Sequence, residues 1–90
     1  MNRQELHHLL REAGVAAGIY QIAGVHECSP VPPDFCFLRE ADGAWEVGTY
    51  ERGQYHTDLR VRTETEACDH LYRLLTGREP SLKNHPADYS

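Results

Sequence analysis

The stretch that decides the fold is DFCFLREADGAWEVGTYERGQYHTDLRVR, residues 34–62, in which extended segments alternate with tight turns. Its first segment, Asp34 to Glu40, contains the apolar run Phe35–Leu38, which predicts a strand covered on both faces or nearly so. Residues 41–43 and 51–54 have the composition of turns, with glycine supplying positive φ angles. Three strands joined by short turns make an antiparallel meander.

The second and third strands of this meander read as half-buried. Apolar and polar residues alternate over 45–50 and again over 55–62, which predicts one apolar and one polar face. The apolar face is expected to carry Trp45, Val47, Leu59 and Val61. The opposite face is expected to meet solvent or a partner, and its residues are Glu46, Tyr50, His56, Asp58, Arg60 and Arg62.

A helix is predicted on each side of the meander. Asn2 and Glu5 have the spacing of a capping box, so the first helix is expected at about residues 3–13. Thr63 and Glu66 have the same spacing, and the apolar stripe that follows ends at Gly77 and Pro80.

A connection joins the first helix to the meander. Ile19–Ile22 reads as a short extended run, and the proline-containing stretch Gly24–Pro33 reads as a stiff loop. The expected fold is therefore α+β: a two-layer sandwich of helix, short strand, three-stranded antiparallel meander and helix, with both helices on one face of the sheet. We expect one domain over residues 1–80 and a C-terminal tail over 81–90.

Composition narrows the class of protein. The 90 residues carry nine Lys and Arg against fourteen Asp and Glu, a net charge of −5 with His neutral. This balance argues against nucleic-acid binding, which needs basic residues to neutralise phosphates, and it favours a basic partner. The sequence has neither a membrane-span-length apolar run nor the apolar core of a signal peptide, so we expect a cytoplasmic protein without a membrane partner.

The cysteines and histidines predict neither a disulfide scaffold nor a metal site. Three cysteines are an odd number, and reduced thiols are expected, with a Cys28–Cys36 disulfide left as an alternative. His26 and Cys28 are two residues apart, which is not the spacing of a structural zinc pair. Cys36 and Cys68 lie on apolar segments and read as core residues, so no metal and no cofactor is expected.

Three segments together resemble a group of small bacterial immunity proteins, which are encoded beside polymorphic toxins and neutralise them. They are Asp34–Phe37, Trp45–Gly53 with its W-x-V and E-R-G elements, and Thr63–Cys68, which opens the second predicted helix. The likeness spans about residues 2–76. It departs from the group's pattern at Arg62, where a Phe is expected just before the capping box.

The resemblance implies a protein that binds a cognate toxin and occludes its active site, and not an enzyme. Many such toxins are nucleases with a basic cleft, for which acidic residues would be complementary. The residues predicted to contact the toxin are Glu46, Tyr50, Glu51, Arg52, Tyr55 and Asp58. Arg52 is alternatively a purely structural turn residue.

Two other functions stay open at this point. Cys28 with His26 would suit a small cysteine-dependent enzyme or redox sensor. The exposed sheet or its edge would suit a homodimerising adaptor, although we expect a monomer when the protein is alone.

Overall fold

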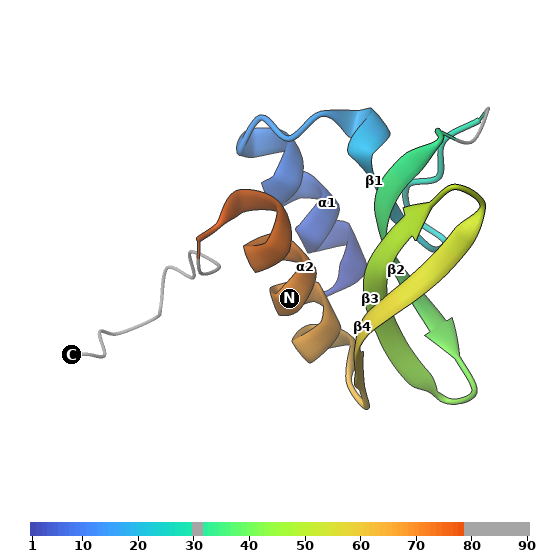
Figure 1. The fold of residues 1–90 in the computed structure, drawn as a ribbon. Coiled ribbons are helices and arrows are strands. Elements are labelled where there is room, and N and C mark those ends of the chain that lie inside the picture. The colour runs from blue at the N-terminus through green and yellow to red at the C-terminus, as the bar shows by residue number, and fades with distance from the viewer. Residues whose placement is uncertain (30–31, 79–90) are drawn as a thin grey trace.

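Helices and strands follow the order that the sequence predicts. The computed structural model describes residues 1–29 and 32–78, so Pro80 and the predicted tail 81–90 lie outside the described residues. The elements are α1 (Arg3–Glu12), the 3-10 helix η1 (Ala17–Ile19), β1 (Tyr20–Ile22), β2 (Asp34–Ala41), β3 (Ala44–Glu51), β4 (Gln54–Val61) and α2 (Glu64–Thr76). Both helices lie on one side of a four-stranded sheet (Figure 1), which confirms the α+β prediction.

The sheet has the strand order β1-β2-β3-β4. Strands β2, β3 and β4 are antiparallel neighbours, and β1 adds a parallel edge strand with Tyr20 opposite Cys36. Two-residue turns join the meander: φ is 54° and 78° at Asp42 and Gly43, and 52° and 81° at Arg52 and Gly53. Positive φ at both central positions is the turn geometry that matches the twist of a hairpin.

Side-chain caps fix both helix starts. The Asn2 side chain accepts from the Glu5 N–H at 2.8 Å, and the Glu5 carboxylate accepts from the Asn2 N–H at 2.9 Å, so the predicted box is complete. The Thr63 hydroxyl accepts from the Glu66 N–H at 3.2 Å, but the Glu66 carboxylate accepts from that hydroxyl and not from the backbone. Gly77 ends α2 in the left-handed conformation, with φ of 73°.

The main core lies between the helices and the sheet. Its buried residues are Leu6, Leu10, Tyr20, Ile22, Leu38, Val47, Ala67, Cys68, Leu71 and Tyr72, with Trp45 and Val61 packed against them. The apolar face of the meander was therefore predicted correctly at these strand positions. Arg3 connects α1 to α2 and to the loop after β1. Its guanidinium donates to the Glu64 carboxylate at 3.1 Å and to the Ala23 carbonyl at 2.8 Å.

Phe35 and Phe37 are buried outside this core. They are 5% and 3% exposed, yet they alternate along β2 with Cys36 and Leu38, whose side chains join the helix layer. Because successive side chains of a strand point to opposite faces, the two phenylalanines lie on the face without helices. The prediction that β2 is covered on both faces is confirmed, and side chains of the sheet itself supply the second cover.

A β-bulge changes the alternation of β4. Val47 pairs with Leu59 but Gly48 pairs with Thr57, so Asp58 is an additional residue between the two pairs. The predicted unbroken alternation over 55–62 is therefore wrong. Before the bulge, Tyr55 and Thr57 share the helix-free face with Tyr50.

The bulge also corrects the expected positions of His56 and Asp58. His56 pairs with Thr49 and so lies on the helix-facing side of the sheet, where it is exposed. The charge of Asp58 acts on the thiol of Cys36, which packs against the helix-side core. Neither residue joins Glu46 on the polar face, where both were expected.

The loop after β1 protects that edge of the sheet. Ile22 and His26 exchange two backbone hydrogen bonds, of 2.8 and 2.9 Å, so the chain folds back along β1. Pairing an edge in this way removes a template for association with other chains. Among the described residues, neither helix has the length and apolar character that crossing a membrane requires.

Candidate functional site

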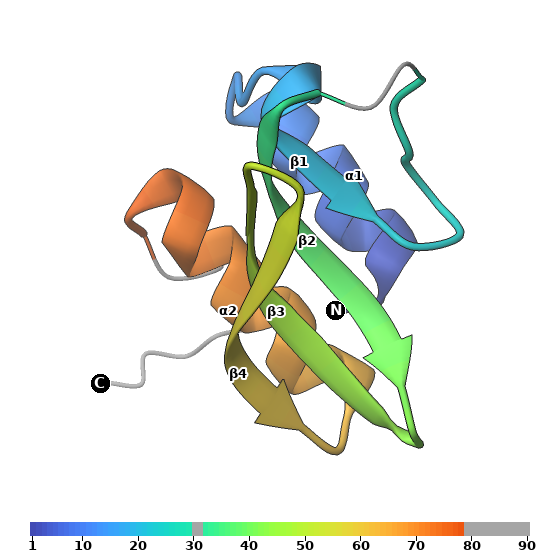
Figure 2. The ribbon, with the colours of Figure 1, turned by 45° about the vertical axis from the view of Figure 1, so that its right-hand side comes forward.

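One side of the sheet is turned away from α1 and α2 (Figure 2), and we name it the open face. The register places on it Gln21 from β1, Phe35, Phe37 and Arg39 from β2, Glu46 and Tyr50 from β3, and Tyr55, Thr57 and Arg60 from β4. Three of the predicted toxin contacts, Glu46, Tyr50 and Tyr55, therefore lie together.

Four aromatic rings form a continuous cluster on the open face. The rings of Phe35 and Tyr50 stack with centroids 4.7 Å apart. Tyr55 meets Tyr50 edge-on at 4.8 Å and Phe37 edge-on at 5.0 Å. These separations are those of favourable aromatic pairs, so the cluster holds its shape without a helix over it. We call these four residues the aromatic cluster.

Arg39 lies between the aromatic cluster and the charged end of the open face, which consists of Arg39, Glu46 and Arg60. Its guanidinium carbon lies 4.3 Å from the ring centroid of Tyr55 and 5.0 Å from that of Phe37. Both distances are within the range of cation–π attraction, so contact with the two rings restrains the flexible arginine. An ordered arginine beside exposed aromatic surface loses little entropy when a partner binds.

Glu46 is held between two arginines. Its carboxylate accepts from Arg39 Nε at 3.1 Å, from Arg60 Nη1 at 2.6 Å and from the Thr57 hydroxyl at 3.4 Å. Partial burial by itself raises the pKa of the Glu46 carboxyl, but the hydrogen bonds and charges of Arg39 and Arg60 outweigh it, and the pKa is lowered. Glu46 is thus anionic and already paired.

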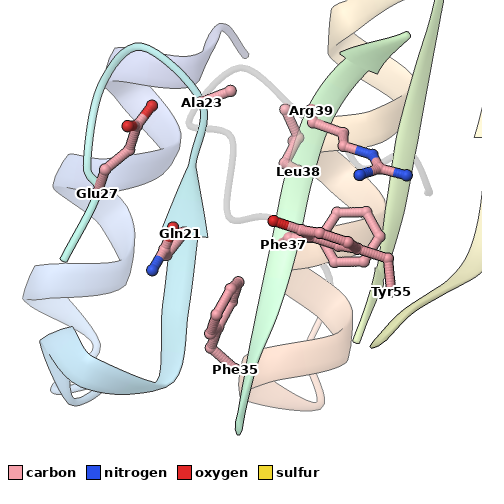
Figure 3. A pocket seen from close by; sticks show the side chains of 8 residues that line it. All are labelled: Gln21, Ala23, Glu27, Phe35, Phe37, Leu38, Arg39 and Tyr55. Atoms are coloured by element: carbon pink, nitrogen blue, oxygen red, sulfur yellow. The ribbon is translucent and has the colours of Figure 1, made fainter. Parts of the chain in front are cut away.

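A pocket of about 180 Å³ opens beside the aromatic cluster, between β1 and β2 (Figure 3). Its lining residues are Gln21, Ala23, Glu27, Phe35, Phe37, Leu38, Arg39 and Tyr55. Gln21 and Glu27 stand on one side of it, and Phe37, Arg39 and Tyr55 on the other. A cavity of about 150 Å³ can hold a benzene ring, so one side chain of a partner would fit.

The remaining predicted contacts lie at the end of the β3–β4 hairpin or behind the sheet. Glu51 and Arg52 are exposed at the turn, and the side chain of neither has a hydrogen bond or ion pair with the described residues. Arg52 occupies a left-handed position that asparagine, aspartate or glycine usually fill. Asp58 is the extra residue of the β4 bulge, and its charge acts on the thiol of Cys36, which packs against the helix-side core.

Sequence reasoning missed Phe35, Phe37 and Arg39 as site residues because the run around Cys36 read as core. The alternation of side chains between the two faces of a strand was the signal in the sequence that could have placed them on the open face. With both helices on one side and Leu38 directed at them, Phe37 and Arg39 must point away.

The Cys28–His26 pair is close but not arranged for nucleophilic catalysis. Cys28 Sγ lies 3.8 Å from His26 Nε2, and both atoms lie within hydrogen-bonding distance of the Ala17 carbonyl, at 3.4 and 2.8 Å. A carbonyl oxygen only accepts hydrogen bonds, so Nε2 carries its hydrogen here and does not take the thiol proton. His26 instead stacks on His7, with ring centroids 4.7 Å apart, and packs on Tyr20 at 4.8 Å.

The cysteines are unpaired, and the other two are unreactive by environment. All three are free, so the alternative Cys28–Cys36 disulfide is not formed. Burial, assisted by the charge of Asp58, raises the pKa of the Cys36 thiol. Burial, assisted by Glu64, raises that of Cys68 to about 12. Within residues 1–29 and 32–78, no group of three or more potential ligands is placed to hold a metal ion.

A comparison with protein-family models, with curated proteins and with solved structures returns no match for this chain. The function is therefore argued from the open face itself.

Proposed function

We propose that this protein is an immunity protein that binds a cognate bacterial toxin through the open face and neutralises it by covering the toxin's active site. The observation that carries the proposal is the aromatic cluster with Arg39 held against it, on a sheet face that no helix covers in the described part of the chain.

The composition of the open face supports protein binding. Tyrosine, phenylalanine and arginine are enriched at protein interfaces, and tyrosine and arginine dominate their energetic centres. Tyr55 is 50% exposed while its neighbour Phe37 is buried, so a rigid apolar base carries an accessible ring. An anchor that is ordered before binding costs little entropy on association.

The proposal is tested with the protein encoded by the neighbouring reading frame. That protein should arrest growth when expressed alone, and co-expression of the present chain should restore growth. Tyr55→Ala should weaken binding by about 2 kcal/mol, or roughly 30-fold in Kd, as expected of an interface hot spot. Isothermal titration calorimetry measures the Kd directly.

Leu74 provides a matched control. It is 44% exposed on α2, in the helix layer, and Leu74→Ala removes a comparable exposed apolar side chain. This variant should keep the wild-type Kd and full rescue. Rescue that survives Tyr55→Ala but not Leu74→Ala would place the contact on the helices and refute the assignment to the open face. An absence of rescue by the wild type would refute the immunity function.

The β4 edge bears on the homodimerising alternative. The bulge at Asp58 interrupts the regular geometry that strand pairing requires, and charged residues such as Arg60 flank it. We therefore propose that the protein is a monomer when alone. Light scattering at micromolar concentration should give the mass of one chain, and a dimer would favour the adaptor.

A further inference from the structure

The charged end of the open face has more hydrogen-bond donors than acceptors. Arg39 donates to Glu46 through Nε, and Arg60 donates to the same carboxylate through Nη1. No other side-chain hydrogen bond of either arginine connects it to the described residues. A guanidinium carries several N–H donors, so most of those on Arg39 and Arg60 have no acceptor among the described residues.

Glu46 cannot supply the missing acceptors. It already accepts three hydrogen bonds, and its side chain is only 12% exposed. The sequence pointed to this carboxylate as an acidic contact for a basic partner. In the folded chain it instead fixes the two arginines, and two cations against one anion leave a positive surplus.

A donor without an acceptor also lies beneath the surface of the neighbouring pocket. Nε2 of Gln21 is buried and has no acceptor among the described residues. On the same side of the pocket as Gln21, Glu27 is the one carboxylate in the lining, and it accepts from the Gly24 N–H at 2.8 Å on its own loop. Of the acids expected on this face, Glu46 is paired with two arginines and Glu51 lies exposed at the end of β3.

We infer that the surface recognised by the open face is acidic: a carboxylate of the partner lies against Arg39 and Arg60 while an adjoining apolar side chain enters the pocket. This deepens the proposed function and rests on it, because it specifies the chemistry of the toxin surface that is covered. Planar guanidinium groups suit carboxylates because two parallel N–H donors meet two oxygens. The surplus charge favours this partner over the basic cleft suggested by the net charge of the whole chain.

Arg60→Gln is the decisive variant, with the neighbouring-frame toxin as the probe in calorimetry. Arg60 is half-exposed, and Arg39 still neutralises Glu46 in its absence, so the variant should fold. Loss of a charge-assisted hydrogen bond should raise Kd about tenfold or more. Arg60→Lys keeps the charge without the planar fork and should give an intermediate Kd. Arg11→Gln removes the same charge from exposed α1 and should leave Kd unchanged.

Glu51→Gln removes a negative charge, so its effect on Kd should differ in sign from that of Arg60→Gln. Glu51 is exposed at the end of β3, and an acidic partner surface predicts that the variant binds as tightly as the wild type or more tightly. Weaker binding by Glu51→Gln, with Arg60→Gln unchanged or tighter, would show a basic partner surface and overturn the inference. The proposed function would survive that result, whereas no binding by the wild type would refute both. A wild-type dimer that Arg60→Gln dissociates would identify a second copy as the occupant and also overturn the inference.

Discussion

Replacing Gly48 by alanine tests whether the bulge fixes the position of β4. A Cβ atom at residue 48 would overlap the carbonyl oxygen of His56 and lie 2.9 Å from both its carbonyl carbon and the Thr57 Cα. These neighbours are backbone, so they yield only if β4 moves away from β3. Overpacking of this kind costs about 1–3 kcal/mol, and the conformational advantage of alanine over glycine returns about 0.5–1 kcal/mol.

We expect Gly48→Ala to lose about 1 kcal/mol of unfolding free energy, which lowers Tm by roughly 4–8 °C in a domain of this size. Thermal and urea unfolding followed by the fluorescence of Trp45, the single tryptophan, measures the change. Gly18→Ala is the control, because a Cβ there meets nothing within 4 Å, and it should be neutral or stabilise by about 0.4–1 kcal/mol. Equal stability of the two variants would refute the close approach of β4 at Gly48.

Three further variants or labelling experiments follow from the electrostatics. Burial, the charge of His26 and the charge of Arg11 lower the pKa of His7 below 6.5, so the unfolded chain binds a proton at this residue more readily than the folded chain does. The free energy of unfolding should therefore be highest above pH 6.5 and fall as the pH decreases below that value. His7→Phe should reduce this dependence on pH, measured by urea unfolding at several pH values. The pKa of the Glu46 carboxyl is lowered by its pairing with Arg39 and Arg60, so the stability that this pairing adds is present above pH 4.5 and is lost as acid protonates the carboxylate at lower pH. Glu46→Gln should therefore cost about 1 kcal/mol at pH 7 and progressively less as the pH falls below 4.5, measured by the same method. Cys68 should resist a thiol reagent at pH 8 until the protein unfolds, because its pKa of about 12 leaves almost no thiolate, and labelling of Cys68 as fast as of half-buried Cys28 would contradict its burial.

Local signals account for the part of the fold that the sequence predicts well. The Asn2–Glu5 box and the left-handed Gly77 mark helix ends through hydrogen bonds within one turn of chain. Glycines beside Asp42 and Arg52 mark the hairpin turns in the same way. Each of these features depends on residues a few positions apart, so pattern reading suffices.

The open face depends on contacts that no local pattern contains. The β4 bulge lies where the Gly48 backbone is close to His56. Tyr55 and Thr57 are found on either face of a strand, so their regular alternation with Leu59 did not reveal that the strand is interrupted. A glycine inside a strand was the one available sign of a bulge. The burial of Phe37 without a helix likewise needs Tyr55 from another strand.

The proposed function requires the open face to be the surface that contacts the toxin. Cross-saturation NMR on the complex tests it most directly, by irradiating the toxin and recording which side chains of the labelled chain lose intensity. If the open face contacts the toxin, strong losses are expected at Phe37, Tyr50 and Tyr55 and none at Leu74 on α2. Losses confined to α1 and α2, with the signal of Tyr55 unchanged, would contradict it.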